Sequence, residues 1–246
     1  MGRVVFIGAG PGAADLITLR GLRWLGQADV VLCDALVDPA LRAFAPRARL
    51  VDVGKRGFRD STGQAAIDAM LVHFAEQHQV VVRLKGGDPS VFGRLEEELQ
   101  ALAVHGIDSE VVPGVTAATA AAAATQRPLT RRGQGRSVSL TTAMTREGSL
   151  HASRSADTEV FYMAGKQLAA LGRRLRAAGW DAATPVSVVS RAGWPDQLAS
   201  EHALADLAQA ALLHAGRPTV VVVGAGATAV PPAIRSETEP AQAAVL

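Results

Sequence analysis

The 246-residue sequence has little of several residue types, and each shortage excludes a class of protein. A single cysteine, Cys33, permits no internal disulfide and fits a reducing compartment, which predicts a cytoplasmic protein. Aromatic residues make up only 4% and the basic residues form no long stripe, so we expect no nucleic-acid partner. No apolar run reaches the roughly 18 residues needed to cross a bilayer, so we expect no membrane partner either.

The residues that are present are those of a globular protein. Hydrophobic residues make up 48% and charged residues 20%, and the length is ample for a buried core. Arginine greatly outnumbers lysine, with 22 arginines and 3 lysines, although the net charge is only +2. The planar guanidinium suits recognition of carboxylates, although a GC-rich genome also explains abundant arginine and alanine.

Short apolar runs alternate with segments of helical length along the whole chain. In the first half we expect strands at 4–7, 30–32, 50–53, 80–84 and 110–112, and helices at 15–27, 63–77, 93–105 and 116–125. In the second half we expect strands at 137–141, 158–162, 186–190 and 219–223, and helices at 166–178 and 203–214. This alternation predicts an α/β fold in which helices cover the sheets.

A basic, glycine-containing stretch at 128–136 divides the two runs of alternation. We therefore expect an N-terminal α/β domain over 1–128 and a C-terminal α/β domain over 129–230. The residues 231–246 lose periodicity and carry Pro, Ser, Glu and Gln, which predicts a mobile tail.

The first glycine loop, Gly8–Ala13, follows the first expected strand and satisfies the dinucleotide pattern G-x-G-x-x-A. Asp34 closes the next strand, where a ribose-binding acid of an NAD(P) oxidoreductase would lie. Two residues count against that interpretation. Pro11 removes a backbone N–H that a pyrophosphate needs, and Asp15 brings a carboxylate to the same helix end. The NAD(P) hypothesis stays open but disfavoured.

The second glycine loop joins the strand at 80–84 to the next helix. Gly86 and Gly87 let the backbone approach a ligand closely, and Pro89 fixes the turn. The acids at 96–98 suit the positive end of that helix and make it a poor phosphate site. A neutral or cationic ligand fits better, such as the sulfonium of S-adenosylmethionine.

Seven segments together resemble one known family, the uroporphyrinogen-III C-methyltransferases within the tetrapyrrole methylases. The segments occur in the family's order and spacing and span about residues 3 to 224. They are VFIGAGPG at 5–12, ADVVLCDALV at 28–37, VGKR at 53–56, RLKGGDPSVFGR at 83–94, VVPGVT at 111–116, PLTRR at 128–132 and YMAGK at 162–166.

The resemblance implies two α/β domains with the active site in the cleft between them, and a homodimer. It also implies a cofactor, S-adenosyl-L-methionine, which leaves as S-adenosyl-L-homocysteine. The residues that match the family's cofactor contacts are Pro11, Gly86, Gly87, Asp88, Val91, Thr116, Ala117, Met163, Ala192 and Thr219.

The implied reaction adds methyl groups to C2 and then C7 of uroporphyrinogen III and gives precorrin-2, a precursor of sirohaem, cobalamin and haem d1. Catalytic roles fall by position on Asp34, Lys55 and Arg94. The resemblance places Glu97 and Arg132 on the tetrapyrrole side. Arg56 and Arg131 are further candidates there, because a substrate with eight carboxylates calls for an arginine-lined cleft. The chemistry requires no metal, and the histidines show no paired ligand spacing.

Several positions depart from the family pattern, among them Leu95, Thr142, Ala143 and Ala225. The change at Thr142 and Ala143 is expected to border the cleft and to affect substrate fit or rate. Two alternatives within the same fold therefore stay open. One is a methylase of a later precorrin, and the other is a tetrapyrrole-binding paralogue without turnover.

Overall fold

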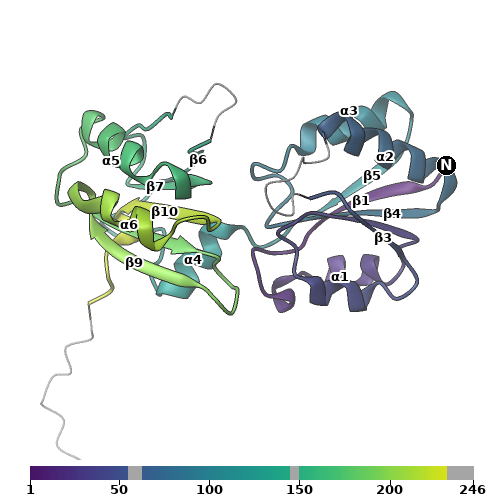
Figure 1. The fold of residues 1–246 in the computed structure, drawn as a ribbon, viewed down its shortest axis with the longest axis horizontal. Helices are drawn as coiled ribbons and strands as arrows, with labels where there is room; N and C mark the ends of the chain where they lie inside the picture. Colours follow the sequence, from purple (N-terminus) through teal and green to yellow (C-terminus); the bar gives the residue numbers. More distant parts are fainter. Residues whose placement is uncertain (55–62, 145–149, 232–246) are drawn as a thin grey trace, which may run out of the picture.

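The computed structural model describes residues 1–54, 63–144 and 150–231. They form two five-stranded sheets with helices on both faces of each, and the two halves lie side by side along the long axis (Figure 1). Within these residues, no helix combines the length and the apolar character needed to cross a membrane.

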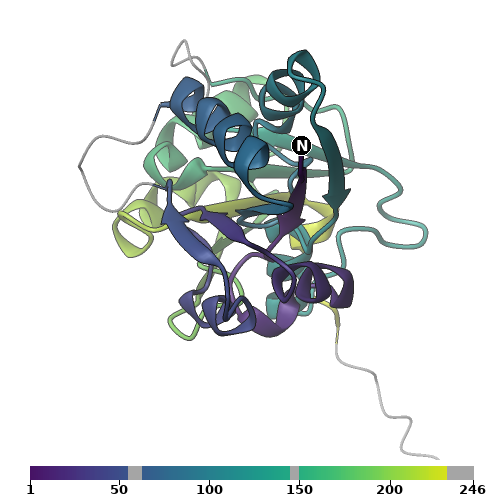
Figure 2. The ribbon, with the colours of Figure 1, turned by 90° about the vertical axis from the view of Figure 1, so that its right-hand side faces the viewer.

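The first sheet is wholly parallel, with strand order β3-β2-β4-β1-β5. Its central strands are buried on both faces and are therefore mostly apolar, with the buried Arg83 and Lys85 near the end of β4 as the exceptions. One face packs against α1 and the other against α2 and α3 (Figure 2). The strands are β1 (Arg3–Gly8), β2 (Val30–Cys33), β3 (Arg49–Asp52), β4 (Val80–Lys85) and β5 (Asp108–Val112); the helices are η1 (Ala14–Leu16), α1 (Leu19–Leu25), η2 (Pro39–Phe44), α2 (Gln64–Gln77) and α3 (Leu95–Val104).

The second sheet is mixed, with strand order β6-β7-β10-β8-β9. Only β6 and β7 run parallel, and the other neighbours are antiparallel. Its strands are β6 (Val138–Thr142), β7 (Thr158–Tyr162), β8 (Pro185–Ser190), β9 (Leu198–Ala203) and β10 (Thr219–Gly224). The helices are α4 (Ala117–Thr125), η3 (Ala164–Lys166), α5 (Leu168–Ala177), η4 (Leu204–Gln209), α6 (Ala210–Leu213) and η5 (Ala225–Ala227).

The predicted α/β class is confirmed, and two expected helices differ in detail. The helix expected over 15–27 is interrupted, because Thr18 is extended and its hydroxyl accepts the N–H of Gly21, which starts α1 anew. The helix expected over 203–214 begins after an unpredicted edge strand, β9. That strand, LASEHA, is only partly buried and lacks the apolar alternation that identifies strands.

Helix α4 packs against the second sheet, although the predicted boundary at residue 128 assigns it to the first domain. Its small side chains Ala118 and Ala121 lie in one apolar cluster with Val160 and Val220. We therefore propose that the boundary lies at 113–116, where the chain leaves β5. The tail predicted over 231–246 falls outside the described residues beyond Pro231.

Candidate active site

The two glycine loops pack directly on each other at the carboxyl edge of the first sheet. The Gly10 N–H donates to the Gly87 carbonyl at 3.2 Å, and the Gly87 N–H donates back at 2.7 Å. Both residues have positive φ, 79° and 72°. A Cβ atom on Gly8 would lie 2.6 Å from the Gly114 Cα, so the loop that contains Gly114 packs against the two glycine loops. Here the glycines bring strand ends together, and only glycine permits this approach.

The backbone donors of the first loop are already used by the protein. The Ala9 N–H donates to the Lys85 carbonyl at 2.8 Å, and the Ala13 N–H donates to the Gly193 carbonyl at 2.8 Å. With the Gly10 N–H also engaged, these donors do not face a pyrophosphate. The dinucleotide pattern therefore has a structural origin, and the geometry counts against NAD(P).

A cavity lies where these loops meet the second domain, and we call it the cleft cavity. It is lined by every residue that the resemblance assigns to the cofactor, from Pro11 on the first loop to Thr219 on β10. The side of Gly87 where a Cβ would project is open space, which leaves room for a ligand against the backbone. Its lining is mainly apolar with a few polar groups, as in small-molecule sites generally.

The sequence analysis missed several lining residues, of which Tyr162 is the most connected. Its hydroxyl lies 2.7 Å from the Thr116 Oγ1 and accepts the N–H of Ala118 at 3.3 Å. Its ring packs against Phe92, with centroids 5.0 Å apart. Burial raises the pKa of Tyr162 above its ordinary value despite these hydrogen bonds, so the phenol is neutral at neutral pH. The motif that predicts Met163 contains Tyr162 and was the available signal.

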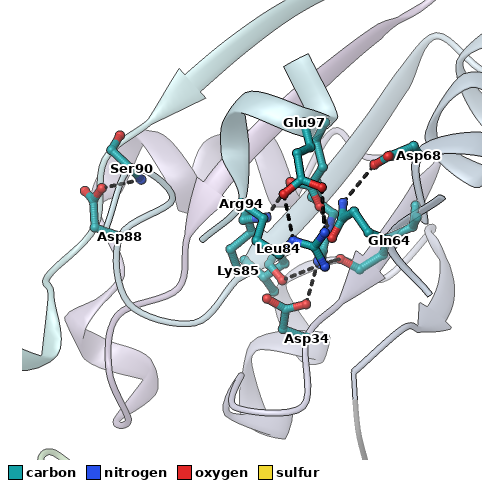
Figure 3. A network of polar contacts seen from close by, with 12 residues as sticks. Asp34, Gln64, Asp68, Leu84, Lys85, Asp88, Ser90, Arg94 and Glu97 are labelled. Carbon is teal, nitrogen blue, oxygen red and sulfur yellow. Dashed lines mark hydrogen bonds and ion pairs between the residues drawn. The ribbon is translucent and has the colours of Figure 1, made fainter. Parts of the chain in front are cut away.

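Asp88 holds the second glycine loop in place. One carboxylate oxygen accepts the Ser90 N–H at 2.7 Å and the other accepts the Gly114 N–H at 2.9 Å. The carboxylate therefore ties the second loop to the segment that leads into α4. Figure 3 shows Asp88 and Ser90 on one side of this loop and Asp34, Lys85, Arg94 and Glu97 on the other.

A buried ionic network supports Asp34. Arg83, only 3% exposed, donates to the Asp34 Oδ1 at 2.6 Å and to the Glu98 Oε1 at 2.9 Å. Lys85 pairs with the second oxygen of the fully buried Glu98. Burial lowers the pKa of Lys85 and Arg83 lowers it further, whereas Glu98 opposes both effects. Asp34 and Lys85 line a second cavity, which shares Gly86 with the cleft cavity.

Arg94 and Glu97 form a bidentate pair that lines a separate cavity, which shares Phe92 with the cleft cavity. The Arg94 Nε lies 2.8 Å from the Glu97 Oε1, and its NH2 lies 2.5 Å from the other oxygen. Arg94 is the N-cap of α3 in a left-handed conformation, with φ of 55°. Because the pair is nearly half exposed, it contributes at most about 1 kcal/mol and opens cheaply for an incoming carboxylate.

The remaining predicted residues are placed differently. Lys55 and Arg56 lie outside the described residues. The Arg131 guanidinium donates to the carbonyls of Thr228 and Ala229, toward the end of the second domain. Arg132 is exposed in the turn that follows. Neither Arg131 nor Arg132 lines the cleft cavity, so their substrate role stays a prediction without support from this geometry.

The departures from the family pattern also lie away from the cleft cavity. Ala143 is fully buried in the core of the second domain, and its N–H donates to the Tyr162 carbonyl at 2.8 Å. The Thr142 hydroxyl bonds the backbone of Met144. Leu95 is the first residue of α3 and packs against the apolar cluster between α2, α3 and the first sheet. In the part of the chain that is described, no cluster of His, Cys, Asp and Glu is arranged to hold a metal ion.

A buried hydrogen-bonded chain runs from the cleft cavity to His214. The Thr219 hydroxyl donates to the Arg217 carbonyl at 2.8 Å, so it accepts from Ser190 at 2.7 Å. The Ser190 oxygen then accepts from the His214 Nδ1 at 2.6 Å, which places a proton on that nitrogen. The His214 Nε2 lies 2.8 Å from the Ser200 hydroxyl, which is the donor available to it when the ring is neutral.

The neutral His214 predicts a loss of stability in mild acid. Burial lowers the pKa of His214 below its ordinary 6.5, with His202 and Arg217 lowering it further. Below about pH 6.5 the histidine is therefore protonated in the unfolded chain but not in the folded chain. As the pH falls, the free energy of unfolding decreases by up to about 1.4 kcal/mol per pH unit. Denaturant unfolding between pH 7.5 and 5.5 measures this slope. We expect His214→Asn to flatten it and exposed His73→Asn to leave it unchanged; an unaltered slope in His214→Asn contradicts the assignment.

Two α/β domains with a ligand cavity built from both define a cleft enzyme that binds a small molecule without a phosphate cradle. The chain belongs to the tetrapyrrole (corrin/porphyrin) methylases, whose family model matches residues 3–208.

Individual relatives agree with this family. The uroporphyrinogen-III C-methyltransferase of Pseudomonas aeruginosa is 44% identical over 91% of this chain and 93% of its own length. The uroporphyrin-III C-methyltransferase of Thermus thermophilus, solved with S-adenyl homocysteine, matches with a TM-score of 0.79 and 36% identity over 91% of this chain and 97% of its own. A cobalt precorrin-4 methyltransferase matches with a TM-score of 0.80 and 31% identity over 92% of this chain and 96% of its own. The chain spans about half the length of the siroheme synthases among its relatives.

Proposed function

We propose that this chain catalyses the S-adenosylmethionine-dependent C-methylation of uroporphyrinogen III to precorrin-2. The observation that carries the proposal is the cleft cavity, in which all the residues expected to touch the cofactor meet from both domains. The close similarity to full-length uroporphyrinogen-III C-methyltransferases supports the same reaction. The activity belongs to the sirohaem and cobalamin branch of tetrapyrrole synthesis.

The residues of the cleft divide the work of this reaction. When bound, S-adenosylmethionine supplies an activated methyl group on a sulfonium. The backbone at Gly86 and Gly87 and the side chain of Tyr162 line the cavity and would hold the cofactor with its methyl group in line with a pyrrole carbon of the substrate. We assign to Asp34, which pairs with Arg83, the role of taking the proton that the macrocycle loses. Arg94 pairs with a substrate carboxylate in place of Glu97.

A methylase of a later precorrin is the second candidate. The cobalt precorrin-4 methyltransferase shares the fold as closely as the uroporphyrinogen enzymes do, so the fold itself does not select the substrate. Sequence identity favours the first candidate, at 44% against 31%. A purified protein that methylates a precorrin and ignores uroporphyrinogen III would reverse this order.

A calorimetric titration tests the cofactor assignment. We expect S-adenosylhomocysteine to bind at one site per chain and NADH to give no heat, because the first loop uses its N–H groups internally. As a control, Gln77→Ala at the exposed end of α2, outside the lining of the cleft cavity, leaves the affinity unchanged. Saturable NADH binding with no response to S-adenosylhomocysteine would overturn the assignment.

The assembly and the location are proposals of their own. The resemblance to the family supports a homodimer, for which light scattering would give twice the chain mass of 25.5 kDa. A monomer at micromolar concentration would contradict it. The one cysteine, Cys33, is free and buried, and burial raises the pKa of its thiol to about 11. An unpaired, unreactive cysteine supports a reducing, cytoplasmic location.

A further inference from the structure

The loop 191–197, between β8 and β9, lies directly on the first glycine loop of the other domain. The Gly193 carbonyl accepts the Ala13 N–H at 2.8 Å. The Trp194 Nε1 donates to the Pro11 carbonyl at 2.9 Å. Both bonds reach the same short turn, and Pro11 lines the cleft cavity. The second domain thus fixes the backbone of the first at a cofactor-contacting residue.

The fit between these two loops leaves no space for a side chain. A Cβ atom on Gly12 would lie 2.7 Å from the Trp194 Cδ1 and 2.7 Å from the Gly193 carbonyl carbon. Gly193 itself has a φ of 82°, a conformation that glycine adopts without strain. The contact is therefore built by backbone shape on both sides, with the indole and the Leu16 side chain packed into it.

The indole is held from its other side as well. The Arg191 guanidinium lies 4.3 Å from the Trp194 ring centroid, and its Nε donates to Asp196 at 2.7 Å. Arg217 also pairs with Asp196, at 3.3 Å. The ring is thus fixed in one orientation before any ligand binds.

Trp194 separates two cavities. It lines the cleft cavity together with Ala192, and it also lines a neighbouring cavity that contains Asp34. The ring is a wall of the cofactor site, and the loop that carries it is only partly buried.

We propose that Trp194 is a cofactor-positioning residue that joins the two domains across the S-adenosylmethionine site. This inference rests on the proposed function of the cleft cavity. The indole N–H fixes the Pro11 turn, and the ring closes the wall beside the cofactor. Loss of Trp194 therefore weakens cofactor binding, while the chemical step at saturating cofactor and the KM for the tetrapyrrole change little.

Tryptophan fluorescence gives a direct readout. The chain has three tryptophans, so Trp24→Phe with Trp180→Phe leaves Trp194 as the sole emitter. We expect saturable S-adenosylhomocysteine binding to change this emission, with the Kd found by calorimetry. An emission that does not respond while calorimetry shows binding would overturn the role of Trp194 and leave the proposed function intact. An absence of binding by the unsubstituted protein would overturn both.

Two substitutions separate the hydrogen bond from the ring. Trp194→Phe keeps a ring and removes the donor, so we expect about 3- to 10-fold weaker binding of S-adenosylhomocysteine, the worth of one hydrogen bond. Trp194→Ala removes both, and we expect a loss of about 30-fold or more in affinity and in the KM for S-adenosylmethionine. The matched control Trp24→Phe removes a tryptophan that bonds Glu110 far from the cleft, and it leaves both values unchanged. Unchanged affinity in Trp194→Ala, or a fall in kcat that only follows a fall in Tm, would overturn the proposal.

Discussion

Glu98→Gln is expected to lower the free energy of unfolding by about 3–5 kcal/mol, the cost of breaking a buried ion pair from one side. Glu98 is fully buried and accepts from both Arg83 and Lys85. A neutral amide leaves these two buried cations without their shared anion, and its NH2 group faces a donor that it cannot accept from. Urea unfolding at pH 7.5 measures the loss through the transition midpoint.

The matched control is Glu96→Gln, the same substitution two residues earlier in α3. Glu96 is exposed and its neutralisation is expected to change stability by no more than about 0.5 kcal/mol. Equal midpoints for the two variants would show that the network around Glu98 does not stabilise the fold.

Asp34→Asn is expected to lower kcat by about 100-fold or more, the usual contribution of a positioned acid–base group. The amide keeps the shape of Asp34 but takes up no proton from the methylated macrocycle. Because Asp34 also pairs with Arg83, the Tm is measured alongside. Steady-state kinetics with both substrates saturating separates kcat from any change in KM.

Asp38→Asn is the control for this substitution. Asp38 belongs to the same connection after β2, and its carboxylate only accepts the Ala40 N–H at 2.9 Å, a bond that asparagine also makes. We expect wild-type kinetics for Asp38→Asn. If Asp34→Asn lowers the Tm but turns over at the wild-type rate, Asp34 is an anchor for Arg83 and the base is another group.

The sequence was sufficient for most of the fold because the buried strands are continuous apolar runs. β1, β4 and β10 are almost fully buried, so their pattern is independent of which partner covers them. The edge strand β9 was missed because its burial is partial and its stability comes from pairing with β8. The predicted division assigns helix α4 to the first domain, whereas the helix packs on the second sheet. An alanine-rich sequence does not indicate which sheet the helix packs on.

The residues predicted to touch the cofactor line one cavity, and they were predictable from sequence because they sit in short motifs. The hydrogen bonds and ion pairs that hold these residues in place were not predictable in this way. The bonds from Trp194 to Pro11 and from Arg83 to Asp34 join residues distant in the chain, and spacing within a motif says nothing of such pairs. Residue type suggests carboxylate binding for Arg131, and the substrate role stays a prediction, because its guanidinium bonds backbone carbonyls in this structure.

The central claim is tested most directly by counting the methyl groups that the purified protein transfers. Uroporphyrinogen III generated in situ without oxygen is incubated with S-adenosylmethionine and the protein, and the tetrapyrrole is analysed by mass and absorbance. The account predicts a product carrying two added methyl groups and two equivalents of S-adenosylhomocysteine. Folded protein that binds S-adenosylhomocysteine yet leaves uroporphyrinogen III unmethylated would contradict it, and a later precorrin substrate or a binding-only role would take its place.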